Sequence, residues 1–266
     1  MPLPPPAQDS TCLITGASSG IGAEIARALA RRGQGVTLVA RRADRLEELA
    51  SELGDRVRAE VIAGDVSSPE GRGEIIAEAG RRRLTVEVLV NNAGFGSGGR
   101  FHELDREREV EMAELNVVAV VDMAGRLLPE MVARGRGAVL NVASSAAFQP
   151  LPRQATYAAT KAFVLSFTDA LTSDLSGTGV SATALCPGPV KTEFAETAGL
   201  SDAEGGVPSF MWTTAEFNAE EAVKGVESGK RVVVPGRFNY AGALGGQHAP
   251  RGLLLKALGR ITPAGD

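Results

Sequence analysis

The sequence predicts an α/β fold, doubly wound around a central and mostly parallel sheet of seven strands. Short apolar runs, which suit buried strands, alternate along the chain with longer segments of helical periodicity. A glycine-rich loop joins the first apolar run to the first helical segment. Polar candidate residues follow the ends of several runs, and the carboxyl ends of parallel strands are where such sheets bind ligands. Together these observations predict a ligand site at one edge of the sheet.

The expected elements follow one another in regular order. Helical periodicity predicts a first helix after the glycine-rich loop, with Ile25 and Leu29 facing inward. Strands are predicted at residues 12–14, 35–40, 57–62, 86–90, 137–142, 180–185 and 231–235. The later helices are predicted at residues 44–53, 68–79, 105–115, 116–133, 157–175 and 219–228. The helix at residues 68–79 is the weakest, because Gly71 and Gly73 interrupt it.

Length and composition predict the domain organisation. The chain has 266 residues, 44% of them hydrophobic, which suffices for one large domain and not for two ordinary domains with a linker. We therefore expect a disordered arm at residues 1–9 and a single domain at residues 10–266. The proline-rich arm lacks the charged and apolar regions of a signal peptide. A C-terminal tail at about residues 241–266 contains a short apolar stretch, which would suit a neighbouring subunit, a pocket rim or a membrane surface.

Charge and cysteine use exclude several classes of partner. The net charge is −4, from 28 basic and 32 acidic side chains, so no nucleic-acid partner is expected. No apolar run approaches the roughly 18 residues needed to span a bilayer. Cys12 and Cys186 each lie in an apolar context that suits a buried thiol. His102 and His248 have no companions at metal-ligand spacing, so no metal site is expected. These features predict a cytoplasmic protein.

The glycine-rich loop at residues 15–22 reads TGASSGIG and stands between a predicted strand and a predicted helix. In that context glycines allow the backbone to approach a pyrophosphate, and the start of the helix favours an anion. The alternative is a tight turn built from small residues. The residues expected to contact a dinucleotide here are Gly16, Ser18, Ser19, Gly20, Ile21 and Gly22.

The second predicted strand ends in Ala40, followed by Arg41 and Arg42, with no acidic residue before Asp44. In dinucleotide-binding folds an acidic residue at this point binds the adenosine ribose of NAD, whereas an arginine accommodates the 2′-phosphate of NADP. The two arginines therefore predict NADP(H) in preference to NAD(H). The alternative is that they open a solvated loop.

Two further strand ends carry polar side chains. Asp65, followed by Val66, is placed to accept a hydrogen bond from an adenine amino group, or alternatively to cap the next helix. Asn92, Ala93 and Gly94 follow the fourth predicted strand. Such a sequence suits a bound nucleotide, and it also suits a turn built on asparagine side chains.

The chemistry is expected around Tyr157. This residue and Lys161 are four apart and would share one face of a helix, although such pairs also arise by chance. A nearby cation favours the phenolate form, so the lysine is expected to lower the pKa of the tyrosine. A hydroxyl from Ser144, or alternatively Ser145, could bind the oxygen that the tyrosine protonates. Asn116 interrupts an apolar stretch and needs partners if buried, so it is either structural or part of the site.

In this order and spacing, the motifs resemble the classical short-chain dehydrogenase/reductase family. The matching residues are Thr-Gly-x-x-x-Gly-Ile-Gly at 15–22, Asn-Asn-Ala-Gly at 91–94, Asn116, Ser144 thirteen residues before Tyr157, Tyr-x-x-x-Lys at 157–161, and Pro187-Gly188 with Thr192 after it. The resemblance covers about residues 10–195. It implies a Rossmann-type fold and hydride transfer with NAD(P), and the thirteen-residue spacing favours Ser144 over Ser145. Ser19 stands where some NADP-preferring members carry a basic residue, so the expected NADP(H) preference depends on Arg41.

The resemblance also implies a role for each site residue. Ser144 would hydrogen-bond the substrate carbonyl oxygen, and Tyr157 would act as general acid/base. Lys161 would also hold the nicotinamide ribose, and Asn116 would anchor a water that connects the lysine to solvent. The segment with Pro187, Gly188, Val190 and Thr192 would line the cofactor, with Thr192 on the nicotinamide carboxamide.

In this family the stretch at about residues 193–217 is the substrate loop. Here it contains Phe194 and Trp212, which with Phe95 and Phe148 would line an apolar pocket beside Ser144 and Tyr157. This predicts a hydrophobic small-molecule ketone, aldehyde or alcohol as substrate, although the aromatic residues could equally pack the loop itself. The expected NADP(H) preference favours reduction as the direction.

Three functions compete at this point. The first is an NADP(H)-dependent carbonyl reductase or alcohol dehydrogenase. The second is a catalytically silent NADP(H)-binding sensor or scaffold, against which an intact set of Ser144, Tyr157, Lys161 and Asn116 argues. The third is a nucleotide-sugar epimerase or dehydratase, for which the region after Gly188 is short. The apolar helices at residues 116–133 and 157–175 predict a homodimer or homotetramer.

Overall fold

The computed structural model describes residues 3–194, 198 and 208–261. Within these residues, seven strands form one sheet in the order β3-β2-β1-β4-β5-β6-β7, and every neighbouring pair is parallel. The strands are β1 (Ser10–Thr15), β2 (Val36–Ala40), β3 (Ala59–Ala63), β4 (Thr85–Asn91), β5 (Gly137–Val142), β6 (Val180–Leu185) and β7 (Val232–Val233). The predicted seven-stranded, doubly wound α/β fold is confirmed.

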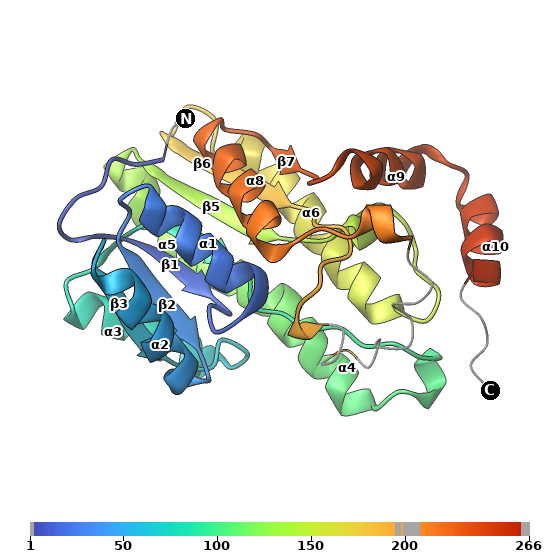
Figure 1. Ribbon diagram of the computed structural model, residues 1–266, viewed down its shortest axis with the longest axis horizontal. Coiled ribbons are helices and arrows are strands. Elements are labelled where there is room, and N and C mark those ends of the chain that lie inside the picture. Colours follow the sequence, from blue (N-terminus) through green and yellow to red (C-terminus); the bar gives the residue numbers. More distant parts are fainter. Residues whose placement is uncertain (1–2, 195–197, 199–207, 262–266) are drawn as a thin grey trace.

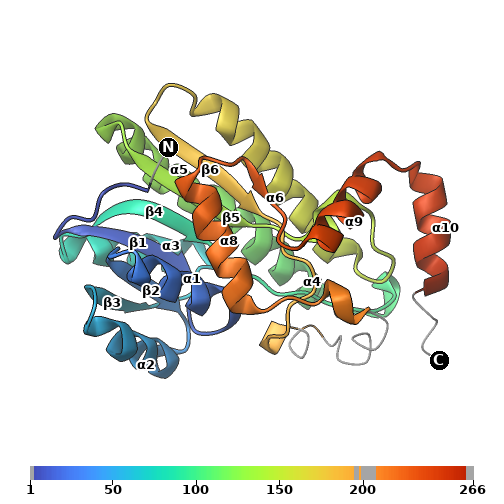
Figure 2. The same ribbon diagram turned by 45° about the horizontal axis from the view of Figure 1, so that its top comes forward.

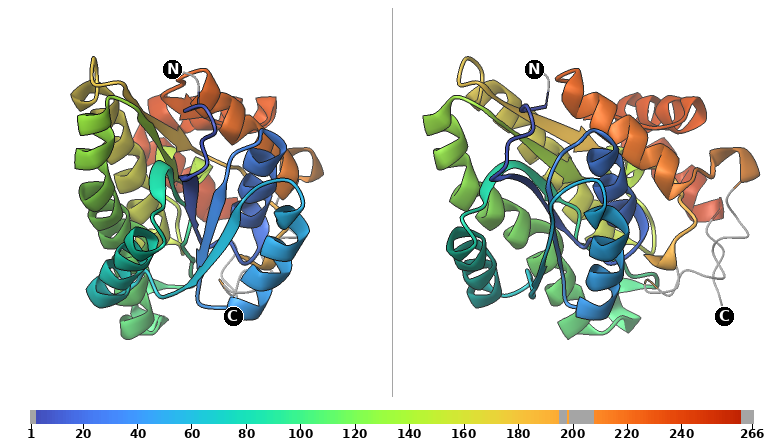
Figure 3. Two further views of the ribbon diagram at one scale, coloured as in Figure 1. Left: turned by 90° about the vertical axis from the view of Figure 1, so that its left-hand side faces the viewer. Right: turned by 60° about the vertical axis from the view of Figure 1, so that its left-hand side comes forward.

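Helices cover both faces of this sheet (Figure 1, Figure 3). One face carries α1 (Gly20–Arg31), α2 (Ala43–Gly54) and α8 (Ala215–Glu227), and the other carries α3 (Pro69–Arg81), α5 (Ala119–Arg134) and α6 (Ala155–Asp174). Successive side chains of a strand point to opposite faces. Ile14 accordingly joins the core beneath α1, whereas Leu13 joins the core beneath α5.

The order of the strands reverses between β1 and β4. The chain runs outward to β2 and β3 on one side and to β5, β6 and β7 on the other. In parallel sheets, the crevice at the carboxyl ends of such a pair is the usual ligand site. The loops that begin at Gly16 and Asn92 leave β1 and β4 at this point.

The helix that was expected to break at Asn116 continues through it. α4 (Arg106–Ala113) leads through a π-helical turn (Glu114–Val118) directly into α5. A π-helical turn adds one residue to the helix and is frequently found at functional sites. Asn116 lies within this turn.

Two helices follow β7, α9 (Arg237–His248) and α10 (Arg251–Ile261), where the sequence predicted only a tail. They lie on the side of the molecule opposite α2 and α3 (Figure 2). α9 is rich in glycine, which disfavours helices, but it packs against the short turn Ser145–Phe148. A side chain at Gly246 would come within 2.7 Å of the Gln149 side-chain oxygen. Tertiary packing therefore stabilises a helix that local propensity does not predict.

The segment before β1 was expected to be a disordered arm at residues 1–9. From Leu3 onward it lies against the body of the protein: Leu3 packs against the core beneath α1, and Gln34 Nε2 donates a hydrogen bond to the Pro4 carbonyl at 2.8 Å. Gln34 is buried and needs a partner. The first two residues lie outside the described part of the chain.

Among the helices that the structure describes, none is long and apolar enough to cross a bilayer.

Candidate active site

The glycine loop is held against the strand end beside it. The Asn92 side-chain amide donates hydrogen bonds to the carbonyls of Thr15 (3.0 Å) and Gly16 (3.2 Å). Thr15 Oγ1 in turn accepts from the backbone N–H groups of Asn92 and Ala93, each at 3.0 Å. A Cβ atom at Gly16 or Gly22 would lie 2.8 or 2.4 Å from the Asn92 amide nitrogen, so this close approach requires glycine at both positions. Thr15 is a contact that the sequence reasoning missed, although it opens the motif.

The start of α1 has the features of an anion site. Its N-cap residue is Ser19, whose side chain makes no capping hydrogen bond, and the first turn contains no acidic residue. The first N–H groups of a helix lack partners within it and carry the positive end of its dipole. Together with the glycine backbone, this arrangement fits a pyrophosphate.

Arg42, and not Arg41, lies on the glycine loop. Its guanidinium donates to Ser18 Oγ from Nε (3.2 Å) and Nη2 (3.0 Å), and to Ser19 Oγ from Nη2 (2.9 Å). Arg41 is exposed. The expected NADP(H) preference was attributed to Arg41, whereas the arginine that contacts the glycine loop is Arg42. Arg42 is the N-cap residue of α2, where the backbone turns, and no local pattern says which of two adjacent arginines faces the loop.

Asp65 does not cap α3. Its Oδ1 accepts a hydrogen bond from the Ser67 N–H at 2.9 Å, whereas Ser68 is the capping residue and accepts from the Gly71 N–H at 3.0 Å. Val66 is buried, and its carbonyl accepts from Nη1 of the buried Arg72 at 2.9 Å. Asp65 follows β3 at the carboxyl edge of the sheet, where its contact with an adenine stays a prediction.

Tyr157 and Lys161 lie one turn apart near the start of α6. The Ser144 hydroxyl, which follows the end of β5, lies close enough to Tyr157 to influence the pKa of its phenol. Lys161 is 5% exposed, and its Nζ donates to the Val142 carbonyl at 2.8 Å and lies 5.9 Å from the centre of the tyrosine ring. The structure therefore joins Ser144 to the tyrosine, while the backbone N–H of Ser145 donates to the Pro187 carbonyl at 2.8 Å.

Asn116 links the loop after β4 to α6. It is 1% exposed, and its amide donates to the Phe95 carbonyl (3.0 Å) and to Thr160 Oγ1 (3.1 Å), while its oxygen accepts from the Phe95 N–H (3.2 Å). Thr160, another residue that the sequence reasoning missed, donates to the Tyr157 carbonyl at 2.7 Å. A Cβ at Gly94 would lie 2.7 Å from Asn116 Oδ1 and 3.6 Å from Lys161 Nζ. Asn116 therefore has a structural role, and it lies on the same side of Gly94 as Lys161 does.

Burial has a larger effect than neighbouring charges on the pKa values of Tyr157 and Lys161. It raises the pKa of Tyr157, and the hydrogen bond from Ser144 acts in the opposite direction. Burial also lowers the pKa of Lys161 from 10.5 to about 8. The expected lowering of the tyrosine pKa by the lysine is not found, because burial has the largest effect on this phenol and raises its pKa. Tyr157 is accordingly a protonated phenol at neutral pH.

The lowered pKa of Lys161 predicts a pH-dependent stability. Between about pH 8.5 and 10 the lysine is largely neutral in the folded protein and largely protonated in the unfolded chain, so unfolding takes up a proton. The free energy of unfolding should therefore rise with pH, by about 2 kcal/mol over this interval relative to Lys161→Met, at about 1.4 kcal/mol per pKa unit. Denaturant titrations of both proteins across this interval measure the difference. A difference that does not change with pH would contradict a buried lysine of this pKa.

The segment after β6 crosses the same edge of the sheet. Gly188 lies so close to Asn239 that a Cβ there would be 2.3 Å from the amide, and Asn239 Nδ2 donates to the carbonyls of Met211 and Pro235, each at 3.1 Å. Val190 forms an isolated bridge with Thr213. Thr192 Cγ2 would lie 3.4 Å from a Cβ on Gly20, which brings this segment over the glycine loop. No sequence signal pointed to Asn239.

The four aromatic residues expected around a pocket have different surroundings. The Phe194 ring packs against the Tyr157 ring, with centres 5.5 Å apart, and would meet a Cβ on Gly96 at 2.9 Å. Phe95 lies beneath the Arg108 guanidinium, 5.0 Å from it. Phe148 packs against the core between β5 and α6, and Trp212 is half-buried after the turn Ser209–Met211. Residues 195–197 and 199–207 of the predicted substrate loop lie outside the described residues.

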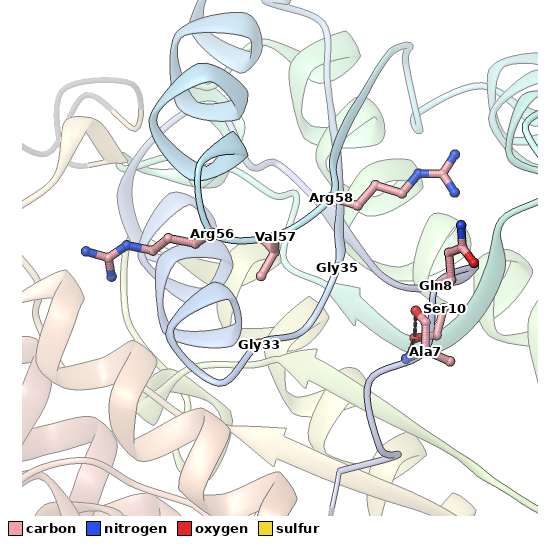
Figure 4. Close-up of a pocket in the computed structure, with 8 residues that line it drawn as sticks. All are labelled: Ala7, Gln8, Ser10, Gly33, Gly35, Arg56, Val57 and Arg58. Atoms are coloured by element: carbon pink, nitrogen blue, oxygen red, sulfur yellow. Dashed lines mark hydrogen bonds between the residues drawn. The ribbon is translucent and has the colours of Figure 1, made fainter.

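A separate pocket of about 430 Å³ lies at the opposite edge of the sheet (Figure 4). Its lining comes from the amino ends of β1, β2 and β3 and includes Ser10, Gly35 and Arg58. The Arg56 and Arg58 guanidiniums point away from its centre (Figure 4). Sheets of this kind bind ligands at the carboxyl ends instead, so the pocket is not the candidate site. Within the described ranges no cluster of three or more His, Cys, Asp or Glu side chains could hold a metal ion.

Comparisons with known proteins agree with this geometry. The short chain dehydrogenase family matches residues 10–202. Sulfoacetaldehyde reductase 2 of Chromohalobacter salexigens is 39% identical over 184 residues, which are 68% of this chain and 73% of that protein. A short-chain dehydrogenase from Sphingobium yanoikuyae in complex with NADPH has a TM-score of 0.78 at 30% identity, over 97% of this chain and 98% of that one.

A bulky-bulky ketone specific alcohol dehydrogenase from Comamonas testosteroni has a TM-score of 0.75 at 26% identity, over 98% of this chain and 97% of that one. The family match covers most of the chain, residues 10–202. The chain therefore belongs to the short-chain dehydrogenase/reductase family, whose members are oxidoreductases that act on CH–OH and C=O groups with NAD(P).

Proposed function

We propose that the protein is an NADP(H)-dependent oxidoreductase that interconverts a hydrophobic ketone or aldehyde and its alcohol, with Tyr157 as general acid/base. The observation that carries this proposal is the proximity of the Ser144 hydroxyl to Tyr157, at the carboxyl edge of the sheet and with Lys161 one helical turn away. A proton donor beside a second hydroxyl suits the handling of a single carbonyl oxygen.

The residues around the glycine loop fit a dinucleotide. The Gly16 and Gly22 backbone and the start of α1 would hold the pyrophosphate, and the Arg42 guanidinium has the fork geometry that binds a phosphate in two-point fashion. Thr192 would contact the nicotinamide carboxamide. The Sphingobium yanoikuyae relative was solved with NADPH, which supports the same cofactor here. When bound, the cofactor supplies or accepts the hydride.

The chain itself would orient the substrate and move the proton. Ser144 would donate a hydrogen bond to the carbonyl oxygen, and Tyr157 would transfer its phenolic proton to that oxygen during reduction. The raised pKa of Tyr157 keeps this proton available at neutral pH. The resulting phenolate would be stabilised by Ser144 and by Lys161, which is charged below its pKa of about 8. Asn116, bonded to Phe95 and Thr160, would hold the loop and α6 in register during this transfer.

Phe194 supports a hydrophobic substrate, because its ring packs at a tilt against the Tyr157 ring, with centres 5.5 Å apart. The Comamonas testosteroni relative is specific for bulky ketones. We expect Phe194→Ala to lower kcat/KM for a bulky aromatic ketone by about tenfold, and to change that for a small aldehyde by less than about twofold, since the lost contact is apolar. Phe238→Ala is the matched control, because Phe238 is an exposed aromatic residue of α9 whose ring likewise packs against one other ring, that of Phe210. Equal losses for both substrates would contradict the assignment of Phe194 to the substrate.

The direct test is the oxidation of NADPH and NADH by the purified protein against a panel of ketones, aldehydes and quinones. Turnover that is faster with NADPH and with bulky apolar ketones supports the proposal. Turnover with small polar polyols and none with bulky ketones would contradict the hydrophobic substrate. Tight NADPH binding without turnover on this panel, or on alcohols with NADP⁺, would favour a silent binding protein instead.

The homo-oligomer and the cytoplasmic location remain predictions. Exposed apolar side chains on α5 and α6 support the first of them: Val121, Val132 and Phe163 are each more than a third exposed.

A further inference from the structure

The Glu193 carboxylate is paired with Arg42, the arginine proposed to bind the cofactor phosphate. Its Oε2 accepts a hydrogen bond from Arg42 Nη1 at 3.0 Å, and its Oε1 lies 3.6 Å from Arg45 Nη1. The same Arg42 guanidinium donates to Ser18 and Ser19 of the glycine loop. The hydrogen bond from Arg42 lowers the pKa of the Glu193 carboxyl, so this group is an anion at neutral pH.

The position of Glu193 explains how it reaches these groups. It directly follows Thr192, which lies over Gly20, the first residue of α1. A hydrogen bond from the Ser19 side chain, at the N-cap of that helix, also favours the charged carboxylate. Two guanidiniums and a serine hydroxyl beside a helix start are groups that would otherwise hold a phosphate. In this structure the anion that these groups contact is the Glu193 carboxylate.

We propose that Glu193 is a specificity-determining residue whose carboxylate competes with the 2′-phosphate of NADP(H) for Arg42 and Arg45. This inference rests on the proposed function. A 2′-phosphate can pair with Nη1 of Arg42 only after the Glu193 carboxylate has moved away from that nitrogen. A carboxylate that stays nearby repels the phosphate. NAD(H) has no phosphate at that position, so it can bind while the ion pair persists. Arg42 and Arg45 favour the binding of NADP(H) over NAD(H), and Glu193 makes this difference in affinity smaller.

The expected change in NADPH affinity is small, because the side chains that form these ion pairs are exposed to solvent. The side chains of Arg42, Arg45 and Glu193 are 45%, 48% and 46% exposed, and exposed ion pairs contribute little because water screens them. We therefore expect Glu193→Gln to lower the dissociation constant of NADPH by about three- to fivefold and that of NADH by less than about twofold. The NADPH effect should shrink with added salt.

The test measures dissociation constants by the fluorescence of NADPH and NADH, so it does not depend on a known substrate. Glu48→Gln is the matched control, because it removes the same charge from an exposed position on α2 and should leave both constants unchanged. In an Arg42→Gln background, Glu193→Gln should lose most of its effect on NADPH, since the two residues act as a pair.

The outcomes separate the inference from the function on which it rests. Equal NADPH dissociation constants for wild type and Glu193→Gln, or an equal gain with Glu48→Gln, would overturn the role of Glu193 and leave the NADP(H) proposal standing. Equal gains for NADPH and NADH would also overturn it, because the 2′-phosphate would then be irrelevant. Failure of the wild type and the variant to bind either dinucleotide would overturn both proposals.

Discussion

Replacing Tyr157 by phenylalanine should lower kcat/KM for carbonyl reduction by about 10²- to 10⁴-fold, the usual contribution of a positioned general acid. The substitution keeps the ring that packs against Phe194 and removes only the hydroxyl near Ser144. Because no other part of the ring changes, the dissociation constant of NADPH should stay within about twofold of the wild-type value, which separates proton transfer from cofactor binding.

The chain offers a matched control for this experiment. It contains two tyrosines, and the other one, Tyr240, is exposed on α9. Tyr240→Phe removes the same atom from a site without a proposed role and should leave kcat/KM unchanged. A Tyr157→Phe enzyme that keeps more than about a tenth of the wild-type rate would exclude Tyr157 as the acid, and a loss of NADPH binding would mean that the hydroxyl serves the cofactor.

Replacing Gly22 by alanine should have the second largest effect, on the glycine loop. The new Cβ would lie 2.4 Å from Asn92 Nδ2 and 2.5 Å from the Gly16 carbonyl oxygen. The carbonyl belongs to the backbone, and the Asn92 amide is held by its hydrogen bonds to the carbonyls of Thr15 and Gly16, so the loop must move away from the strand end of β4. We expect a loss of about 2–4 kcal/mol in the free energy of unfolding, as for overpacked buried sites, and NADPH binding weakened by at least about a hundredfold, since the distorted backbone supplies the phosphate contacts.

Thermal unfolding and NADPH titration measure the two effects. Gly80→Ala is the control: Gly80 is exposed in α3 and has no atoms within 4 Å of the new Cβ. Alanine favours helices over glycine by up to about 1 kcal/mol, so the control should be neutral or slightly stabilising. If Gly22→Ala binds NADPH as the wild type does, the loop does not carry the pyrophosphate.

Much of the fold follows from local sequence. The apolar runs at 137–142 and 180–185 correspond to β5 and β6 residue for residue, because a buried parallel strand needs a continuous apolar stretch. The pairing of Tyr157 with Lys161 is also local, since four residues along one helix bring side chains onto one face. The positions of Gly16 and Gly22 could be predicted because close backbone approach demands glycine at fixed spacing.

Only the tertiary structure decided what these groups touch. Arg42 reached the loop in place of Arg41, and Glu193 came to it from the far end of β6. The glycine-rich α9 is a helix that packs against the turn after β5. The pKa of Tyr157 rose, where the neighbouring lysine alone predicted a fall. Periodicity and spacing in the sequence encode the local backbone conformation of each element. The contacts of an arginine and the pKa of a tyrosine depend instead on distances between strand ends that are far apart in the chain. Those distances are set only when the sheet and its helices pack together.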